Sequence, residues 1–184
     1  MNLRTIALAS SALTIALVLA GCSNTASTST MPSDMPGMDH GSSSSASTEF
    51  NDADVAFVVQ MIPHHQQAVE MADILLSKTD VDPRVVELAT QIKSAQGPEI
   101  ATMTSWLEVW GLPAPEPMDG MMMDGMMSQD DMDALTNASG SESSKLFLQQ
   151  MIQHHQGAID MAQEDLSTGM NPDALDLAQK IIDA

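Results

Sequence analysis

The sequence predicts an all-α protein, an up-and-down four-helix bundle built from two αα-hairpins. The first observation is an internal repeat, because residues 57–72 and 147–162 are identical at ten of sixteen aligned positions. The second is that each copy leads into a segment opening with a cap residue and a proline, Asp82-Pro83 and Asn171-Pro172. Each repeat therefore forms two helices joined by a short turn, and two such hairpins make a bundle.

The bundle domain is expected over residues 50–184. Its repeats are placed at 50–110 and 141–184, and its helices at about 52–77, 83–110, 128–137, 141–167 and 172–184. The last helix has 13 residues, whereas its counterpart in the first repeat has 28. We interpret it as truncated relative to a symmetric ancestor. One end of the bundle should then expose apolar surface that a partner or a second copy covers.

The N-terminal segment has the features of an export signal. One early positive charge, Arg4, precedes an apolar run that ends in Leu-Ala-Gly-Cys at Cys22, which resembles the bacterial lipobox. We expect residues 1–21 to be removed and Cys22 to be lipidated, which anchors the protein on the extracytoplasmic face of the cell membrane. The alternative is an uncleaved membrane anchor, for which the run is short. Because Cys22 is the only cysteine, lipidation leaves no thiol for disulfides, metal thiolates or catalysis.

Two segments outside the main helices are rich in methionine. Residues 22–49 are expected to form a flexible tether, because half of residues 23–48 are Ser or Thr. The crossover at 111–140 is too long for a bare connection, so it is either disordered or functional. We expect both to capture metal ions in a secondary role, with a polar linker of incidental methionines as the alternative for the tether. The candidate ligands are Met31, Met35, Met38 and His40 in the tether, and Met118, Met121, Met122, Met123, Met126 and Met127 in the crossover.

Composition excludes some partners. The formal net charge is -19 at pH 7, which repels nucleic-acid phosphates and anionic headgroups. Aromatic residues make up 3% of the chain and tyrosine is absent, so base stacking is not expected. The sequence therefore predicts no nucleic-acid partner.

Methionine and histidine form a stripe on both repeats. At 100° per residue the stripe contains Met61, His64, His65 and Met71 in the first repeat and Met151, His154, His155 and Met161 in the second. Neighbouring histidines are 100° apart, so we do not expect both of a pair to bind the same ion. Glu99 and Met103 lie on the apolar face of the next helix. A buried carboxylate there should face a histidine, a metal or a polar end of the bundle.

Thioether and imidazole donors together favour a soft metal, above all Cu(I), with Ag(I) as a mimic. A thioether needs no deprotonation, so it suits an oxidising compartment. The alternative is structural, with methionines filling the core and histidines hydrogen-bonded in it. Repetition of Met-x-x-His-His in both hairpins favours the metal site. Di-iron catalysis is disfavoured because no Glu-x-x-His pair occurs in the bundle.

The repeated Met-Ile-x-His-His-Gln-x-Ala motif, together with Gln96-x-x-Glu99 and Met103-x-x-Trp106, closely resembles the family catalogued as domain of unknown function 305, which includes CopM-type copper-binding proteins. The similarity runs from about Phe50 to the C-terminus. It implies a ferritin-like helical bundle, often exported, that binds copper outside the cytoplasm, and it places the stripe residues, Glu99 and Met103 on the family's motif positions. A second Gln-x-x-Glu segment is absent from the second repeat, which weighs against a symmetric site.

The leading interpretation is a lipid-anchored, extracytoplasmic protein that buffers or transfers Cu(I) without catalytic turnover. A second hypothesis is a metal-dependent oxidase that uses Glu99 with the histidines. A third is a structural or partner-binding lipoprotein whose histidine faces serve packing or assembly of an oligomer. Copper uptake, oxygen consumption and oligomeric state distinguish the three.

Overall fold

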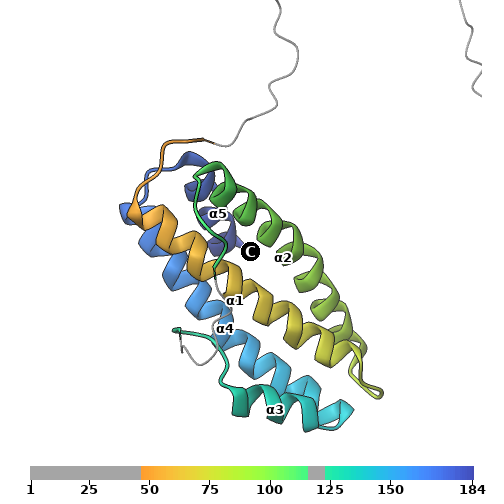
Figure 1. Ribbon diagram of the computed structural model, residues 1–184. Helices are drawn as coiled ribbons and strands as arrows, with labels where there is room; N and C mark the ends of the chain where they lie inside the picture. The colour runs from red at the N-terminus through yellow and green to blue at the C-terminus, as the bar shows by residue number, and fades with distance from the viewer. Residues whose placement is uncertain (1–46, 116–122) are drawn as a thin grey trace, which may run out of the picture. The chain divides into compact units, whose positions relative to one another are not determined.

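The computed structural model describes residues 47–115 and 123–184, and within these ranges the protein is all-α, as the sequence predicts (Figure 1). It contains no strand in the described residues. The helices are α1 (Asp52–Leu76), α2 (Pro83–Val109), α3 (Gln129–Asn137), α4 (Gly140–Thr168) and α5 (Pro172–Asp183). None of them combines the length and the apolar character needed to cross a membrane.

The helix starts follow from local capping. Asn51 caps α1 and closes a capping box with Asp54, while Ser128 does the same for α3 with Asp131. Asp82 and Asn171 cap α2 and α5, and each is followed by a proline at the first helical position. These boundaries depend on short-range chemistry, which explains why they agree with the sequence expectation to within one or two residues.

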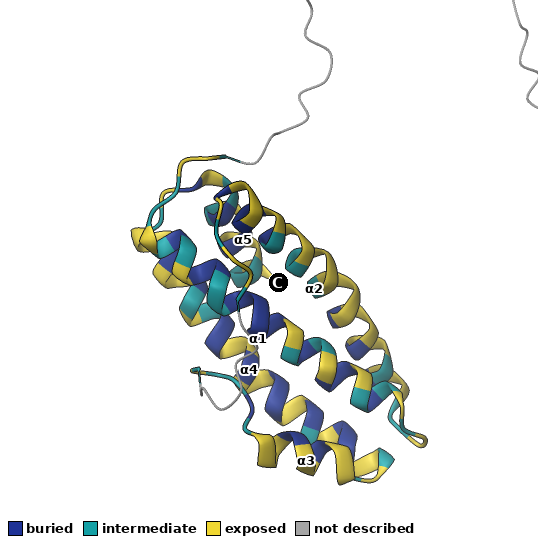
Figure 2. Ribbon diagram, in the orientation of Figure 1, coloured by how far each residue is buried: buried dark blue, intermediate teal, exposed yellow. Residues whose placement is uncertain are grey.

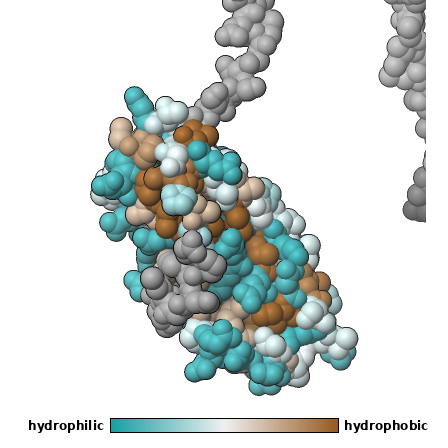
Figure 3. All heavy atoms as spheres, in the orientation of Figure 1, coloured by the Kyte–Doolittle hydropathy of each residue, from teal (hydrophilic) through white to brown (hydrophobic). Residues whose placement is uncertain are grey.

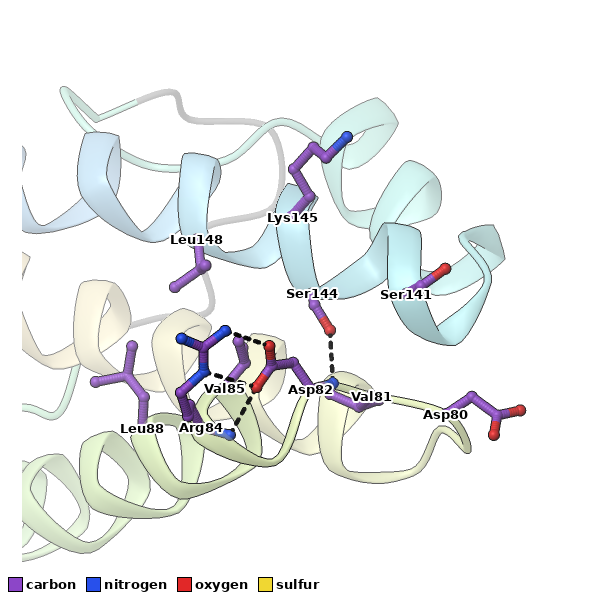
Figure 4. A pocket seen from close by; sticks show the side chains of 10 residues that line it. All are labelled: Asp80, Val81, Asp82, Arg84, Val85, Leu88, Ser141, Ser144, Lys145 and Leu148. Atoms are coloured by element: carbon purple, nitrogen blue, oxygen red, sulfur yellow. Dashed lines mark hydrogen bonds and ion pairs between the residues drawn. The ribbon is translucent and has the colours of Figure 1, made fainter.

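The helix directions differ from a simple up-and-down order. The amide of Asn51, before α1, donates to the carbonyl of Thr168 at the end of α4, so α1 and α4 are antiparallel. The backbone amide of Asp82 donates to Ser144 Oγ at 3.2 Å, so the starts of α2 and α4 lie together and these helices run the same way (Figures 1 and 4). The crossover between the hairpins returns the chain to the end from which α2 began. Helix directions therefore do not alternate along the chain, because the connection is long.

Two clusters of buried side chains form the core. Figure 2 shows buried residues recurring along α1 and α4. One cluster contains Phe57, Met61, Trp106 and Leu107 and joins α1 and α2 to α4 and α5. The other contains Met71, Leu75, Phe147 and Met151 and joins α1, α2 and α4 to α3 and the end of the crossover. His64 lies between Met61 and Met71 on α1, and His154 lies between Met151 and Ala158 on α4. The histidines are thus held where the two apolar clusters meet.

The short α5 leaves part of the bundle uncovered. It has 12 residues against 27 in α2, so only part of α2 has a neighbour on that side. Beyond α5, a hollow of about 800 Å³ separates the beginnings of α2 and α4, with Leu88 and Leu148 facing it (Figure 4). These two leucines are 37% and 36% exposed. The structure therefore leaves apolar surface between α2 and α4. On the face shown in Figure 3, hydrophobic patches lie between hydrophilic residues.

Candidate metal centre

The centre of the candidate site is a pair of histidines from the two repeats. His64 of α1 and His154 of α4 are 0% and 1% exposed, and their ring centroids lie 3.7 Å apart with an angle of 36° between the rings. The two residues occupy equivalent positions in the repeat, so the packing of α1 on α4 brings them together. None of their four ring nitrogens has a hydrogen-bond partner within the described part of the chain. Buried polar atoms are rarely left in this state, and a bound ion is one explanation for it.

Burial keeps both rings neutral. Desolvation, followed by the nearby His65 and His155, lowers the pKa of His64 to about 3. Desolvation and then His64 lower the pKa of His154 to about 2. A neutral imidazole offers one nitrogen lone pair, which is the form that binds metals. The pair therefore presents two ligand nitrogens without requiring a proton to leave.

His65 makes a different contact. Its Nε2 lies 2.8 Å from Oε2 of Glu99 on α2, and the imidazole is almost completely buried. When Nε2 carries the hydrogen it donates to the carboxylate, which leaves Nδ1 with a lone pair. That Nδ1 is buried and has no partner among the described residues. A carboxylate that orients an imidazole in this way is common behind metal-binding histidines. The sequence expectation that Glu99 faces a histidine is met by His65.

His155 projects to the surface. Its ring centroid is 6.3 Å from that of His154. It lines a hollow of about 360 Å³ together with Glu99, Ile181 and Ile182, bounded by α2, α4 and the end of α5. Neighbouring histidines therefore diverge, as their 100° separation requires. The hollow provides a path from solvent to the edge of the buried pair, because His154 also lines it.

The methionines of the stripe are distributed through the core. Met61 and Met103 belong to one core cluster and Met71 and Met151 to the other, and all four are buried. Met161 is only partly buried and lines a separate hollow with Met123. Across residues 47–115 and 123–184, no three or more His, Cys, Asp or Glu side chains are gathered closely enough to hold a metal ion. The ten-residue ligand set inferred from sequence is therefore divided by the structure into a histidine centre and flanking thioethers.

The secondary ligands are only partly described. Cys22, the tether residues Met31, Met35, Met38 and His40, and the crossover residues Met118, Met121 and Met122 lie outside the described residues. Met127 is buried in the core, and its backbone exchanges two hydrogen bonds with the Gln67 amide, of 2.7 and 2.8 Å. Met123 and Met126 are half-buried. Gln67 thus fixes the end of the crossover on α1 and places Met127 in the interior.

One feature of this molecule was missed by reasoning from the sequence. Asp165 of α4 is 1% exposed and lies beside the equally buried Asp54 of α1. A signal was available, because Asp165 continues the buried stripe of His154, Ala158 and Ala162 at helical spacing. It is an acid on an apolar face, the same signal that identified Glu99.

These features define an all-α protein of two repeated helical hairpins whose facing helices each place a histidine in the core. A family model described as Domain of unknown function (DUF305) matches residues 54–184, and the chain belongs to this family. No curated protein sequence matches the chain.

Solved structures of the same family share the fold. A DUF305 protein from Streptomyces coelicolor, described as secreted, is 34% identical with a TM-score of 0.65, covering 71% of this chain and 82% of that one. A DUF305 fragment from Deinococcus radiodurans is 31% identical with a TM-score of 0.66, covering 72% of this chain and 87% of that one. CopM in its Cu(II)-bound form is 34% identical with a TM-score of 0.61, covering 71% and 86%. CopM also has structures in Cu(I)-bound and Ag-bound forms.

Proposed function

We propose that this protein binds Cu(I) at a centre built on His64 and His154, and that it buffers or transfers the ion outside the cytoplasm. The observation that carries the proposal is the pair of facing, neutral, buried imidazoles whose nitrogens have no partner in the described residues. The similarity of this chain in sequence and fold to CopM, whose structure has been solved with Cu(I), Cu(II) and Ag, supports copper as the ion.

The donor set matches a soft, low-coordinate ion. Two imidazoles alone provide few ligands, which Cu(I) tolerates better than Zn²⁺, whose structural sites take four. Buried thioethers precede and follow His64 along α1, at Met61 and Met71, and one precedes His154 along α4, at Met151. They supply soft sulfur close to the centre without a thiol that could oxidise to a disulfide.

The remaining predicted residues have roles around this centre. His65, oriented by Glu99, and His155 at the hollow form the route by which an ion reaches the buried pair. Met103 and Met161 are flanking thioethers, and the methionines of the tether and of the crossover capture ions from solution. We further propose that lipidation of Cys22 holds the protein on the extracytoplasmic face of the membrane. No catalytic residue is assigned.

A Cu(I) titration against a chelator of known affinity tests the centre. The full chain is compared with the double variant His64→Leu/His154→Leu and with Gln153→Leu as a control at an exposed position of the same helix. The double variant should lose the tightest site, with affinity falling at least about a hundredfold, near 2.7 kcal/mol. The control should keep it. Equal affinity in the double variant and in the unmodified chain would refute the centre.

Two further measurements test the alternatives. Oxygen consumption that depends on added metal would favour the oxidase hypothesis, and we expect none. Replacing Cys22 by Ser should move the protein from the membrane fraction to the soluble fraction. A lipid anchor is contradicted if the variant stays with the membrane.

A further inference from the structure

A second pair of buried groups lies at the C-terminal end of α4, away from the histidines. Asp54 is the third residue of α1 and is completely buried. Its carboxylate accepts hydrogen bonds from the backbone amides of Asn51 at 2.7 Å, Met170 at 3.0 Å and Asn171 at 2.9 Å. Three amide donors stabilise the ionised form of a carboxylate. Asp54 thereby ties the beginning of α1 to the turn between α4 and α5.

Asp165 faces the same turn but has no comparable support. It lies in the last turn of α4, 1% exposed, and neither carboxylate oxygen has a hydrogen-bond partner among the described residues. A Cβ added to Gly169 would collide with Oδ1 of Asp165 and with Oδ1 of Asp54, so the two carboxylates converge on one point. This leaves two buried acids side by side, only one of which is hydrogen-bonded.

The titratable groups found beside Asp165 are acidic. Asp54 of α1 lies next to it, and the hollow of about 420 Å³ that Asp165 lines is also lined by Asp124 from the crossover and by Asp160 and Glu164 from α4. No Lys, Arg or His is among the described residues that line this hollow. A second negative charge beside Asp54 therefore has no counter-ion within the protein. A buried charge without a partner is costly, so something positive must compensate for it.

We propose that Asp54 and Asp165 hold one proton between them, and that this proton keeps the turn between α4 and α5 closed on the beginning of α1. When the proton leaves, two negative charges face each other at Gly169 and the turn loosens. The hydrogen bonds from the backbone amides of Met170 and Asn171 to the carboxylate of Asp54 are then weakened.

A proton fits this pair better than a metal ion does. Only two carboxylates converge, and no group of three or more metal-binding acids or histidines is assembled in the described ranges. Ca²⁺ and Mg²⁺ take six or more oxygen ligands, whereas a shared proton needs one donor and one acceptor. Burial, followed by the charge of Asp54, raises the pKa of Asp165 to about 6. The proton is therefore retained at mildly acidic pH and lost near neutrality.

The turn that this pair controls carries α5. The C-terminal part of α5 supplies Ile181 and Ile182 to the hollow beside His155 and Glu99. A looser turn would change how α5 covers that hollow. This consequence for metal access depends on the proposed function, whereas the proton-dependent turn itself does not.

Hydrogen exchange of the metal-free full chain tests the proposal. Protection factors of amides in the middle of α5, at Leu177 and Ala178, are compared at pH 4.5 and pH 7.5 after correction for intrinsic exchange. A pKa above the unfolded value means that stability is present at low pH and is lost as pH rises from about 4 to about 6. The part of the protection that depends on Asp165, measured as the ratio of the unmodified chain to Asp165→Asn, should therefore fall by about tenfold or more from pH 4.5 to pH 7.5, within the hundredfold that a two-unit shift allows.

Two variants isolate Asp165. Asp165→Asn removes the titration but keeps an amide that can donate to Asp54, so its protection should remain high at pH 7.5. Glu164→Gln is the matched control, because Glu164 is the preceding residue, lines the same hollow and is exposed. It should behave like the unmodified chain. Both variants retain all histidines, so any effect of histidine titration cancels in the comparison.

Three outcomes would overturn the proposal. One is a ratio of protection between Asp165→Asn and the unmodified chain that is the same at pH 4.5 and pH 7.5, and another is a Glu164→Gln control that behaves like Asp165→Asn. The third is full protection restored at pH 7.5 by millimolar Ca²⁺ or Mg²⁺, which would make a cation the occupant. If Asp165→Asn does not fold, carbon NMR of the carboxyl groups in the unmodified chain decides. A midpoint for Asp165 near 4 would contradict the shared proton.

Discussion

The ring centroids of His64 on α1 and His154 on α4 lie 3.7 Å apart, although the two residues are 90 positions apart in the sequence. They are equivalent residues of an internal repeat, and the antiparallel packing of α1 on α4 brings them together. Hydrogen-bonded core histidines would explain such burial, but no nitrogen of either ring has a partner in the described residues. Unpaired buried nitrogens lower the stability of the metal-free protein, and a metal ion at the proposed centre would supply the missing partner.

Replacing both rings by leucine should therefore stabilise the metal-free protein. Each unpaired buried polar group costs about 1–3 kcal/mol, and apolar replacements of similar size remove that cost. We expect His64→Leu/His154→Leu to raise the free energy of unfolding by about 1–2 kcal/mol in urea titrations. Met61→Leu is the packing control and should change it by less than about 1.5 kcal/mol. A large loss of stability in the double variant would show that the rings are held by packing alone.

The same histidines predict how stability depends on pH. Their pKa values are lowered to about 3 and about 2 in the folded protein, so below the unfolded value of 6.5 the unfolded chain binds more protons. Stability from these groups is present above pH 6.5 and is lost as pH falls toward 3. Between pH 7 and pH 5 the metal-free protein should lose about 2–4 kcal/mol relative to the double leucine variant. Curves of the free energy of unfolding against pH that run parallel for the two proteins would contradict this. Asp165 changes stability in the opposite sense, but it is present in both proteins, so its effect cancels when one curve is subtracted from the other.

Glu99 should influence metal binding without being needed for folding. Its contact with His65 at 2.8 Å fixes a ring that lies on the proposed route to the buried pair. Glu99→Gln should therefore slow Cu(I) uptake by about tenfold in a stopped-flow measurement and leave the equilibrium affinity of the buried pair largely unchanged. Glu108→Gln on the same helix, at an exposed position, is the control and should take up Cu(I) as the unmodified chain does. An unchanged rate of uptake in Glu99→Gln would remove His65 from the metal route.

The crossover docks on α4 through two glycines. A Cβ on Gly157 would lie 2.7 Å from the Cα of Gly125 and would collide with the carbonyl oxygen of Asp124, so neither helix nor loop can accommodate a side chain. Gly157→Ala should lower the free energy of unfolding by about 1–3 kcal/mol and displace the loop, as seen by proteolysis near residue 124. Gly97→Ala is the control, since nothing lies within 4 Å of a Cβ there, and it should change stability by less than about 1 kcal/mol. Equal behaviour of the two variants would contradict the close contact.

Much of the fold could be predicted from the sequence because its signals are local. Cap residues such as Asp82 and Asn171, each followed by proline, determine where helices begin, and the repeat shows that two hairpins are present. The 100° separation of His64 and His65 led us to expect that the two would not bind the same ion, and their rings contact different neighbours, His154 and Glu99. Asp165 was overlooked because an acid near a helix end is usually solvated, and its burial depends on Asp54, more than a hundred residues earlier.

The sequence by itself determined the all-α class, the helix boundaries, the duplicated Met and His stripe and the presence of a carboxylate, Glu99, on an apolar helix face. Only the tertiary structure decided that His64 meets His154, that Glu99 meets His65, and that Met61 and Met71 lie in separate core clusters. Periodicity specifies the face of a helix on which a residue lies. Which faces meet depends on the directions and packing of whole helices, and these are set by contacts between residues far apart in the chain.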